Sequence, residues 1–352
     1  CRMAQSILPE GTVINPHFPA AVGLRTLSVQ RLMGLVFGAF VQAAPDRLPA
    51  CPASGGPIMN VNTIDNRTGR RVVASVGPII GGAGGSPFGD GTEGSGANSS
   101  FLKNTPVEIN EVEVPIKIHR YGLASGSGGA GKHRGGTAIE MWFEALAPNT
   151  KITARNMDRT RFTSWGVQGG GAGSLSYFLL NPNTDKERDL GNLDFLTIGP
   201  GDIIHVASGG AGGWGNPLKR HLKLVQQDVQ RGFVSQDSAK KLYGVILNDG
   251  VIDQSASDIL RKKMCGEVSI NPNFFDYGKG RLKFELVWTR KNYDLLTGIL
   301  AAAPVHWRFF IKHRLFNAIG DEAAENNHSR IKTLFDEILE EFPQLKESMN
   351  LR

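Results

Sequence analysis

The chain has 352 residues, 40% hydrophobic and 20% charged, which is long enough to bury one or two hydrophobic cores. No apolar run approaches the roughly 18 residues that argue for a membrane span, so membrane insertion is not expected. The net charge of +6 is spread over both halves, which argues against nucleic-acid binding because that function needs clustered basic side chains.

Cysteine and histidine usage indicates neither a disulfide framework nor a metal site. Cys1, Cys51 and Cys265 are too few and too far apart for a disulfide framework, and none belongs to a C-x-x-C pair. The eight histidines include no H-E-x-x-H motif and no close His/Asp pair at ligand spacing. We therefore expect a reduced, cytoplasmic protein without a metal site of its own.

The first predicted element is a helix over residues 24–44. Gly34 and Gly38 lie one turn apart in it, where another element can approach closely. With Arg31 and Gln30 on its polar side, it is predicted to be an amphipathic packing helix. The apolar residues that recur near the helical period are Leu24, Leu27, Leu32, Leu35, Val36 and Phe40.

Glycine is the most informative residue of the middle region. Glycines number 44, or about 12% against a typical 7%. Of these, 28 fall in four stretches, residues 77–96, 122–136, 166–173 and 199–215. The segments around them are extended and rich in β-branched residues, so the pattern predicts strands joined by glycine loops. The predicted strands are residues 107–120, with Glu111 and Glu113 on its exposed face, and residues 137–143, 151–155, 177–180 and 203–207.

Helices are predicted from Pro217 onward. Ser235 is placed to cap a helix that stops at Gly244, and Asp253 to cap the next one. Before them, a helix is predicted from the spacing of Leu218, Leu222, Val225 and Val229. After them, helical patterns span residues 293–319, with a break at Pro304, and residues 329–342. The fold class predicted is α+β, a glycine-rich β-dominated core with an N-terminal packing helix and a C-terminal helical subdomain. The predicted divisions are residues 1–216, 217–265 and 266–352.

Two glycine motifs approach known nucleotide-binding patterns. Gly126 to Lys132 matches G-x-x-x-x-G-K, but His133 replaces the Ser or Thr that holds magnesium, and a strand rather than a helix follows. Gly210 to Gly215 matches G-x-G-x-x-G, yet Trp214 stands where a pyrophosphate needs open backbone. A structural glycine turn is the favoured interpretation of the first motif, and a tight strand-to-helix connection is that of the second.

Several segments, taken in order, resemble the latter half of hydantoinase B/oxoprolinase proteins. The resemblance covers residues 6–264 and is carried by residues 8–16 (LPEGTVINP), 104–108 (NTPVE), 127–136 (SGGAGKHRGG) and 208–217 (SGGAGGWGNP). Members of that family include hydantoinase B subunits, oxoprolinases, and the large subunits of acetone and acetophenone carboxylases.

The resemblance implies a subunit of an ATP-dependent hetero-oligomeric enzyme. A hydantoinase A-like partner would bind ATP and magnesium and help to phosphorylate a carbonyl or enol oxygen, for hydrolysis of a cyclic amide or carboxylation of a ketone. Family members also carry a long N-terminal half with a divalent-metal motif, which another polypeptide would have to supply. No catalytic or metal-binding residue of the family can be carried over to this sequence.

Three hypotheses follow from the sequence. In the first, backbone amides and two cations bind an anionic substrate or intermediate; the candidate residues are Gly128, Gly129, Gly131, Lys132, Arg134 and Gly212. In the second, the chain is a non-catalytic assembly subunit or a fragment, and its glycines serve turns and close packing. The third is a stand-alone nucleotide-binding module.

Overall fold

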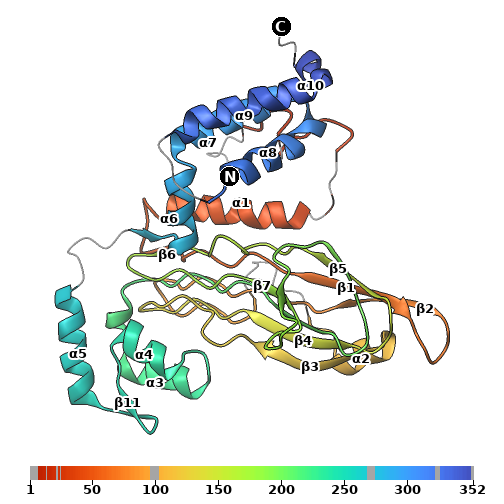
Figure 1. Cartoon of the computed structure of the whole chain (residues 1–352). Coiled ribbons are helices and arrows are strands. Elements are labelled where there is room, and N and C mark those ends of the chain that lie inside the picture. The colour runs from red at the N-terminus through yellow and green to blue at the C-terminus, as the bar shows by residue number, and fades with distance from the viewer. Residues whose placement is uncertain are drawn as a thin grey trace.

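The structure of the chain is a computed structural model that describes residues 7–12, 14–20, 23, 25–95, 103–267, 274–321 and 326–349. Figure 1 shows a β-sandwich beside a region of extended coils, with helices at both ends of the chain. The predicted α+β fold class is confirmed. No helix in the described ranges is long and apolar enough to cross a membrane.

Two antiparallel sheets form the sandwich. The four-stranded sheet has the order β2-β1-β5-β9, and the five-stranded sheet has the order β3-β4-β10-β7-β8. The strands of the first sheet are β1 (Ile58–Ile64), β2 (Arg71–Val76), β5 (Thr150–Arg155) and β9 (Phe195–Ile198). Those of the second are β3 (Ile116–Leu123), β4 (Ile139–Ala145), β7 (Tyr177–Leu180), β8 (Arg188–Asp189) and β10 (Ile203–Ala207).

The period-two pattern of the strands fills the space between the sheets. In β4, Met141 and Phe143 are buried in the sandwich core, whereas Trp142 and Glu144 lie half-buried on the outer face. This alternation follows from the pleat, which turns successive side chains to opposite faces. The predicted strands at 137–143, 151–155, 177–180 and 203–207 are all present, with small shifts at their ends.

The predicted strand over residues 107–120 is wrong in its first half. Residues there form the helix α2 (Val107–Glu113), which begins after Pro106, and β3 starts only at Ile116. Pro106 lacks an N–H and suits a helix start, and the apolar residues of the segment imitate strand alternation over one turn. Glu111, predicted on a strand surface, instead accepts a hydrogen bond of 2.7 Å from the Ile118 N–H.

A small helical unit follows the sandwich, and its helix ends are those predicted. The Ser235 hydroxyl caps the helix α4 (Gln236–Tyr243). This helix ends at Gly244, whose φ is +62°. Asp253 accepts a hydrogen bond from the Ala256 N–H at the start of the third helix. The elements are η1 (Pro217–Lys219), α3 (Leu222–Gln230), α4 (Gln236–Tyr243), β11 (Leu247–Asn248), β12 (Val251–Ile252) and α5 (Gln254–Glu267).

The C-terminal helices pack around their own hydrophobic cluster, which contains Trp288, Leu315 and Phe335. The predicted break at Pro304 is confirmed. The elements are β13 (Phe275–Asp276), which pairs with β6 (Gly166–Val167), and the helices α6 (Gly278–Val287), α7 (Arg290–Ala302), α8 (Val305–Ile319), α9 (Asn327–Glu341) and α10 (Pro343–Ser348). The division of the chain at residues 216 and 265 stays a prediction.

The N-terminal helix α1 (Arg25–Phe40) is present and packs closely at Gly34 and Gly38, as predicted, but most of the apolar residues predicted to pack do not. A β-carbon on Gly38 would lie 3.3 Å from the Trp165 ring, and one on Gly34 would lie 3.9 Å from the Cys51 sulfur. Packing through these small residues brings the helix closest to the chain beneath it. As a result, Leu32, Leu35, Val36 and Phe40 are exposed rather than packed, and Leu24 lies outside the described residues.

Candidate functional site

The four glycine stretches come together in one body, called here the glycine core (residues 81–85, 128–136, 166–173 and 209–215). In Figure 1 they run as extended coils beside the sandwich. Each stretch is bonded to the next through its backbone. The Gly136 N–H donates to the Ala83 carbonyl at 2.8 Å, Gly129 to Ala211 at 2.8 Å, and Gly213 to Gly171 at 2.9 Å. The core is therefore a hydrogen-bonded lattice of extended chains outside the two sheets.

The chains of the glycine core are too close together for side chains. A β-carbon on Gly212 would lie 1.9 Å from the Trp165 carbonyl oxygen, and one on Gly129 would lie 2.2 Å from that of Gly171. At Gly128 and Gly131 the nearest carbonyl oxygens would be 2.1 Å and 2.6 Å away. Because real β-carbons do not approach oxygen so closely, glycine is required at these four positions for packing alone.

The G-x-x-x-x-G-K loop does not have the geometry of a phosphate-binding loop. The N–H groups of Gly129, Lys132 and His133 donate to carbonyl oxygens of the glycine core, at 2.8, 2.9 and 3.0 Å. The loop continues into strand β4 at Ile139, not into a helix whose N-terminus could face an anion. Three of the backbone donors that would cradle phosphates are therefore occupied by the fold.

The G-x-G-x-x-G segment is likewise a structural connection. The Trp214 indole N–H donates to the Pro45 carbonyl at 3.2 Å, and the Trp214 backbone N–H to His133 at 2.9 Å. The segment is followed by η1, α3 and then another helix, α4. A dinucleotide-binding fold would have a parallel strand after its first helix. The tight strand-to-helix connection predicted from the sequence is what the structure contains.

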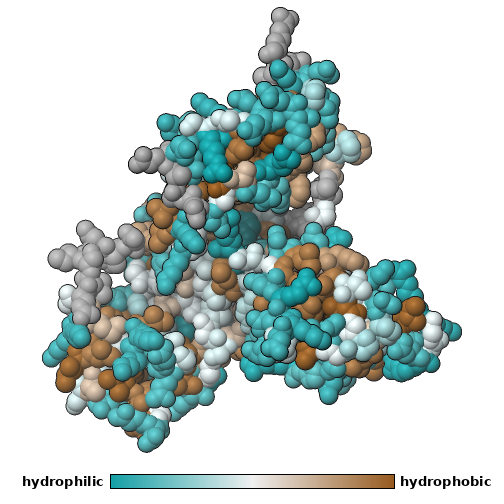
Figure 2. Space-filling model, in the orientation of Figure 1, coloured by the Kyte–Doolittle hydropathy of each residue, from teal (hydrophilic) through white to brown (hydrophobic). Residues whose placement is uncertain are grey.

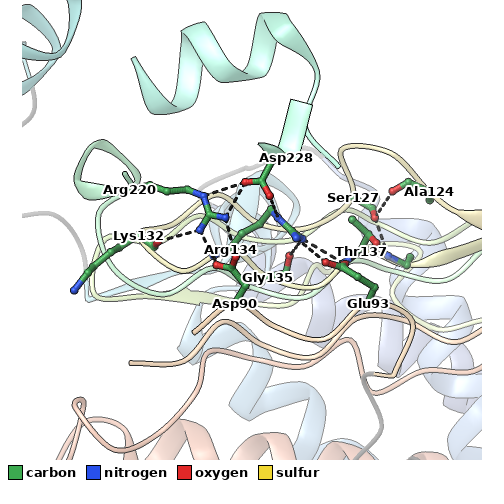
Figure 3. Close-up of polar contacts among 11 residues, drawn as sticks. Asp90, Glu93, Ala124, Ser127, Lys132, Arg134, Gly135, Thr137, Arg220 and Asp228 are labelled. Atoms are coloured by element: carbon green, nitrogen blue, oxygen red, sulfur yellow. Dashed lines mark hydrogen bonds and ion pairs between the residues drawn. The ribbon is translucent and has the colours of Figure 1, made fainter. Parts of the chain in front are cut away.

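A network of buried ion pairs closes one side of the glycine core (Figure 3). The Arg134 side chain, 3% exposed, lies 2.6 Å from Glu93 and 3.6 Å from Asp228. Arg220, 1% exposed, lies 2.6 Å from Asp90 and 2.8 Å from Asp228. Since the carboxylates come from the stretch at 77–96 and from α3, the two arginines tie these segments to residues 134 and 220.

Burial and the neighbouring charges shift the pKa values of the groups in this network. Burial opposes the charge on Arg134, but the hydrogen bond and charge of Glu93 raise the pKa of that guanidinium above its usual value. Burial also works to raise the pKa of Asp90, yet the bond to Arg220 brings it below its usual value. At Asp228 burial prevails and the pKa is raised. Arg134 is thus committed to buried carboxylates.

Lys132 differs from the other candidates because its side chain leaves the network. Figure 3 shows its amino group pointing away from Arg134 and Asp90. Its backbone is fixed, with the N–H bonded to Gly215 and the carbonyl accepting from Arg220 at 3.1 Å. No ion pair to the Lys132 ammonium is present among the described residues. The structure therefore places a free cation at the rim of the glycine core.

The six candidate residues are brought together, although in different roles. Gly128, Gly129, Gly131 and Gly212 lie inside the glycine core, Arg134 is in the ion-pair network, and Lys132 is at the rim. An anion-binding role for any of them stays a prediction. The geometry leaves Lys132 as the member best placed to meet a ligand.

A second polar cluster, which the sequence did not reveal, lies on the outer face of the five-stranded sheet. The Glu140 carboxylate accepts hydrogen bonds from the Tyr177 hydroxyl at 3.0 Å and contacts the His205 Nε2 at 2.9 Å and the Arg120 Nε at 2.6 Å. The His205 ring stacks on Trp142 with ring centres 3.8 Å apart. These residues come from four strands, so only the sheet order unites them.

Titration of this cluster is shifted by burial. Burial lowers the pKa of His205 below its ordinary value of 6.5, although Glu140 opposes the shift. Burial and the charge of Glu140 both raise the pKa of Tyr177. In the part of the chain that the structure describes, no group of three or more His, Cys, Asp or Glu side chains is placed to hold a metal ion. The family's divalent metal therefore has no fitting ligand set there.

The structure combines an antiparallel sandwich with a glycine core whose glycines permit close backbone packing. The hydantoinase B/oxoprolinase family model matches residues 1–217. The chain belongs to the hydantoinase B/oxoprolinase family.

Relatives extend this assignment. The chain is 35% identical over 267 residues to an uncharacterized protein of Methanocaldococcus jannaschii, covering 74% of this chain and 45% of that protein. It is 32% identical over 266 residues to caprolactamase subunit beta of Pseudomonas jessenii, covering 71% and 44%. It is 29% identical over 212 residues to 5-oxoprolinase 1 of Arabidopsis thaliana, covering 60% and 16%. The chain thus spans less than half the length of these relatives.

Two solved structures share the fold. The ATP-dependent caprolactamase of Pseudomonas jessenii has a TM-score of 0.61 at 28% identity, covering 73% of this chain and 46% of that one. Nucleotide-free acetone carboxylase has a TM-score of 0.61 at 18% identity, covering 81% and 44%. At that identity the second comparison shows the fold alone.

Proposed function

We propose that this chain is part of a multi-subunit, ATP-dependent enzyme that hydrolyses a cyclic amide or carboxylates a ketone. Its similarity to a caprolactamase subunit and to 5-oxoprolinase supports this class of reaction. Both reactions begin from an unreactive carbonyl group. Transfer of a phosphoryl group to the carbonyl or enol oxygen turns that oxygen into a leaving group or fixes the enol for attack on carbon dioxide.

ATP and magnesium are bound by a partner of the hydantoinase A type in this proposal. The observation that carries it is the loop at residues 126–133, where the N–H groups of Gly129, Lys132 and His133 are bonded within the glycine core and a strand follows instead of a helix. Two relatives are named as subunits, beta in one case and B in the other. Further polypeptide supplies the rest of the family fold, together with the divalent metal implied by the resemblance.

Within this enzyme, we place the anion-binding site at the rim of the glycine core. The core forms one wall of that site, and Lys132 supplies the cation. A lysine ammonium held on a fixed backbone binds a carboxylate, phosphate or bicarbonate group as a point charge. Arg134 cannot do the same without abandoning Glu93 and Asp228 in a buried environment. The anion-binding hypothesis therefore narrows to Lys132, with Arg134 as its structural neighbour.

The test is substrate-dependent release of ADP by the complex that holds the full chain, purified from its native source. Cyclic amides, and ketones with bicarbonate, are offered in turn, and a photoreactive ATP analogue identifies the polypeptide that binds ATP. We expect labelling of a partner and at least about a tenfold loss of turnover for Lys132→Ala, the effect of removing one charged contact to a transition state. Lys219→Ala, an exposed lysine outside the core, is the control and should retain full turnover.

Labelling of this chain itself, or no response to any such substrate, would contradict the proposal. Labelling of this chain would favour the stand-alone nucleotide-binding module, in which the isolated chain binds ATP or NAD.

A second function is favoured by the engagement of Arg134 and of the core glycines in packing. This is the assembly subunit without chemistry of its own. It predicts that Lys132→Ala leaves turnover unchanged, whereas Gly212→Ala lowers the amount of complex and total activity in proportion. The two proposals differ in turnover per assembled complex.

A further inference from the structure

Helix α1 carries a stripe of large, partly exposed apolar side chains on the face opposite the one that packs against Cys51 and Trp165. The spacing of three, four, seven and eleven residues from Val29 places all five members within one narrow sector of the helix. This set, called here the α1 stripe, has exposures of 55% for Val29, 47% for Leu32, 37% for Met33, 44% for Val36 and 62% for Phe40.

The orientation of the stripe is fixed by the opposite face of the helix. Gly34 and Gly38 pack against Cys51 and Trp165. Arg31, on the same side, donates to the Ala53 carbonyl at 3.1 Å and forms an ion pair with Asp158. Turning the stripe inward would break this pair and bring large side chains to a surface where a β-carbon on Gly38 would already lie 3.3 Å from the Trp165 ring. The stripe is therefore held outward by the fold.

Other exposed apolar residues form shorter rows or none, with pairs one turn apart on α6 (Leu282 and Leu286) and on α8 (Val305 and Phe309). Figure 2 shows brown surface on the sandwich and on the unit of α3, α4 and α5. There the exposed residues are dispersed over several elements, as with Leu242, Val251 and Ile259. Single exposed apolar side chains are ordinary, but a continuous row on one helix marks an interaction surface.

The chemistry of α1 favours a protein partner over a lipid bilayer. The helix has no lysine, and of its two arginines Arg31 is turned inward. Helices that lie on membranes carry a strongly basic polar face beside the apolar one. A neutral apolar row suits the apolar face of another polypeptide.

A second copy of the chain is a poor occupant. At about 1.5 Å per residue, the 16 residues of α1 extend about 24 Å, and a stripe about 10 Å wide covers roughly 240 Å². Two copies joined stripe to stripe would bury about 500 Å², well below the roughly 1,200 Å² of a stable interface. The occupant must therefore be a larger body that also contacts neighbouring surfaces.

We infer that the α1 stripe is the docking surface for the polypeptide that supplies the rest of the hydantoinase B fold, whether joined to this chain or separate. The matched segment covers only 44% to 46% of relatives and solved neighbours, so their fold contains a body of the required size. The inference rests on the proposed function in that this polypeptide belongs to the same complex. It presents a neutral, apolar face to Val36 and its neighbours.

The experiment uses the complex purified from the native source, with p-benzoyl-L-phenylalanine in place of Val36 in the full chain. Irradiation should join α1 to a sequence that aligns with the part of caprolactamase subunit beta that this chain does not match. An adduct to a second copy, to lipid or to the ATP-binding subunit, or no adduct at all, would overturn the inference.

Substitutions provide an independent measurement. The double change Leu32→Asp and Val36→Asp should weaken assembly by at least about tenfold, because a charge then enters an apolar contact. Leu242→Asp, at a comparably exposed apolar position on α4, should leave assembly unchanged. If a separate polypeptide does not exist, protection of residues 25–40 from hydrogen exchange in the longest native chain replaces the assembly measurement. Unprotected amides there would refute the inference.

The inference and the proposed function fail separately. Substrate-dependent ADP release is measured on the same preparations. A correct adduct without ADP release would leave the docking surface standing and reject the enzymatic proposal. ADP release with an adduct elsewhere would support the enzymatic proposal and reject the docking surface.

Discussion

Replacing Gly212 by alanine places a methyl group where the Trp165 carbonyl oxygen is 1.9 Å away and the Gly166 nitrogen 3.0 Å away. Relief requires the two chains to part by more than 1 Å, since an ordinary carbon–oxygen contact is above about 3 Å. The movement would also stretch the bond from the Gly212 N–H to the Cys51 carbonyl, now 2.9 Å. Overpacking by one methylene costs about 1–3 kcal/mol, and two rigid backbones put this site at about 3 kcal/mol or more.

Thermal unfolding followed by tryptophan fluorescence tests this magnitude, because Trp165 and Trp214 border the glycine core. A loss of about 3 kcal/mol corresponds to a melting temperature lower by roughly 6–12 °C for a unit of this size. Gly122→Ala is the control, since its new β-carbon would meet no atom within 4 Å. Equal melting temperatures for the two variants would refute the packing argument.

Three further substitutions test the polar groups. Arg134→Ala should cost about 1–3 kcal/mol in urea unfolding, because Glu93 loses its cation while Arg220 still pairs with Asp228, whereas Lys132→Ala should change stability by less than about 0.5 kcal/mol. Tyr243→Phe should be neutral or stabilising by about 1 kcal/mol, since its buried hydroxyl has no hydrogen-bond partner among the described residues. Burial raises the pKa of Tyr243 to about 12, so its folded form loses stability as pH rises from about 10, and the variant should lose less.

His205 should make the free energy of unfolding depend on pH in the acid range. Its pKa is lowered in the fold, so the neutral form is favoured there, and stability falls as pH drops below 6.5. His205→Gln should reduce the difference between urea midpoints measured at about pH 7.5 and about pH 5.5. Equal differences in variant and parent would contradict the buried, neutral state of this ring.

Local chemistry allowed much of the fold to be predicted. Ser235 and Gly244 bound α4 because a hydroxyl cap and a left-handed glycine act within a few residues. Pro304 separates α7 from α8 for a similarly local reason. One failure was local, at α2, where the apolar residues imitate strand alternation over one turn. The other failures concern contacts between distant segments. The face on which α1 packs depends on Trp165 and Cys51, and no periodicity within the helix reports them.

The same distinction applies to the site. The six candidate residues were chosen for the chemistry of their motifs, and the structure does bring them together. The roles of Gly129 and Arg134 depend on partners in other stretches, Ala211 in one case and Glu93 in the other. The Glu140 cluster was missed for the same reason, since its members are single residues on four separate strands.

The two nucleotide-like motifs have a physical origin in the glycine core. Across the four stretches, 28 of 60 residues are glycine, against 44 of 352 in the chain. The three glycines of G-x-G-x-x-G then occur by chance at roughly one start in ten there, compared with about one in 500 at the average frequency, and the two glycines of G-x-x-x-x-G-K at roughly one in five, compared with about one in 60. A lattice that admits only glycine produces such matches without any ligand. In proteins of this kind, a glycine motif becomes evidence for phosphate only when its N–H groups are free, and here Gly129, Lys132 and His133 have already donated theirs.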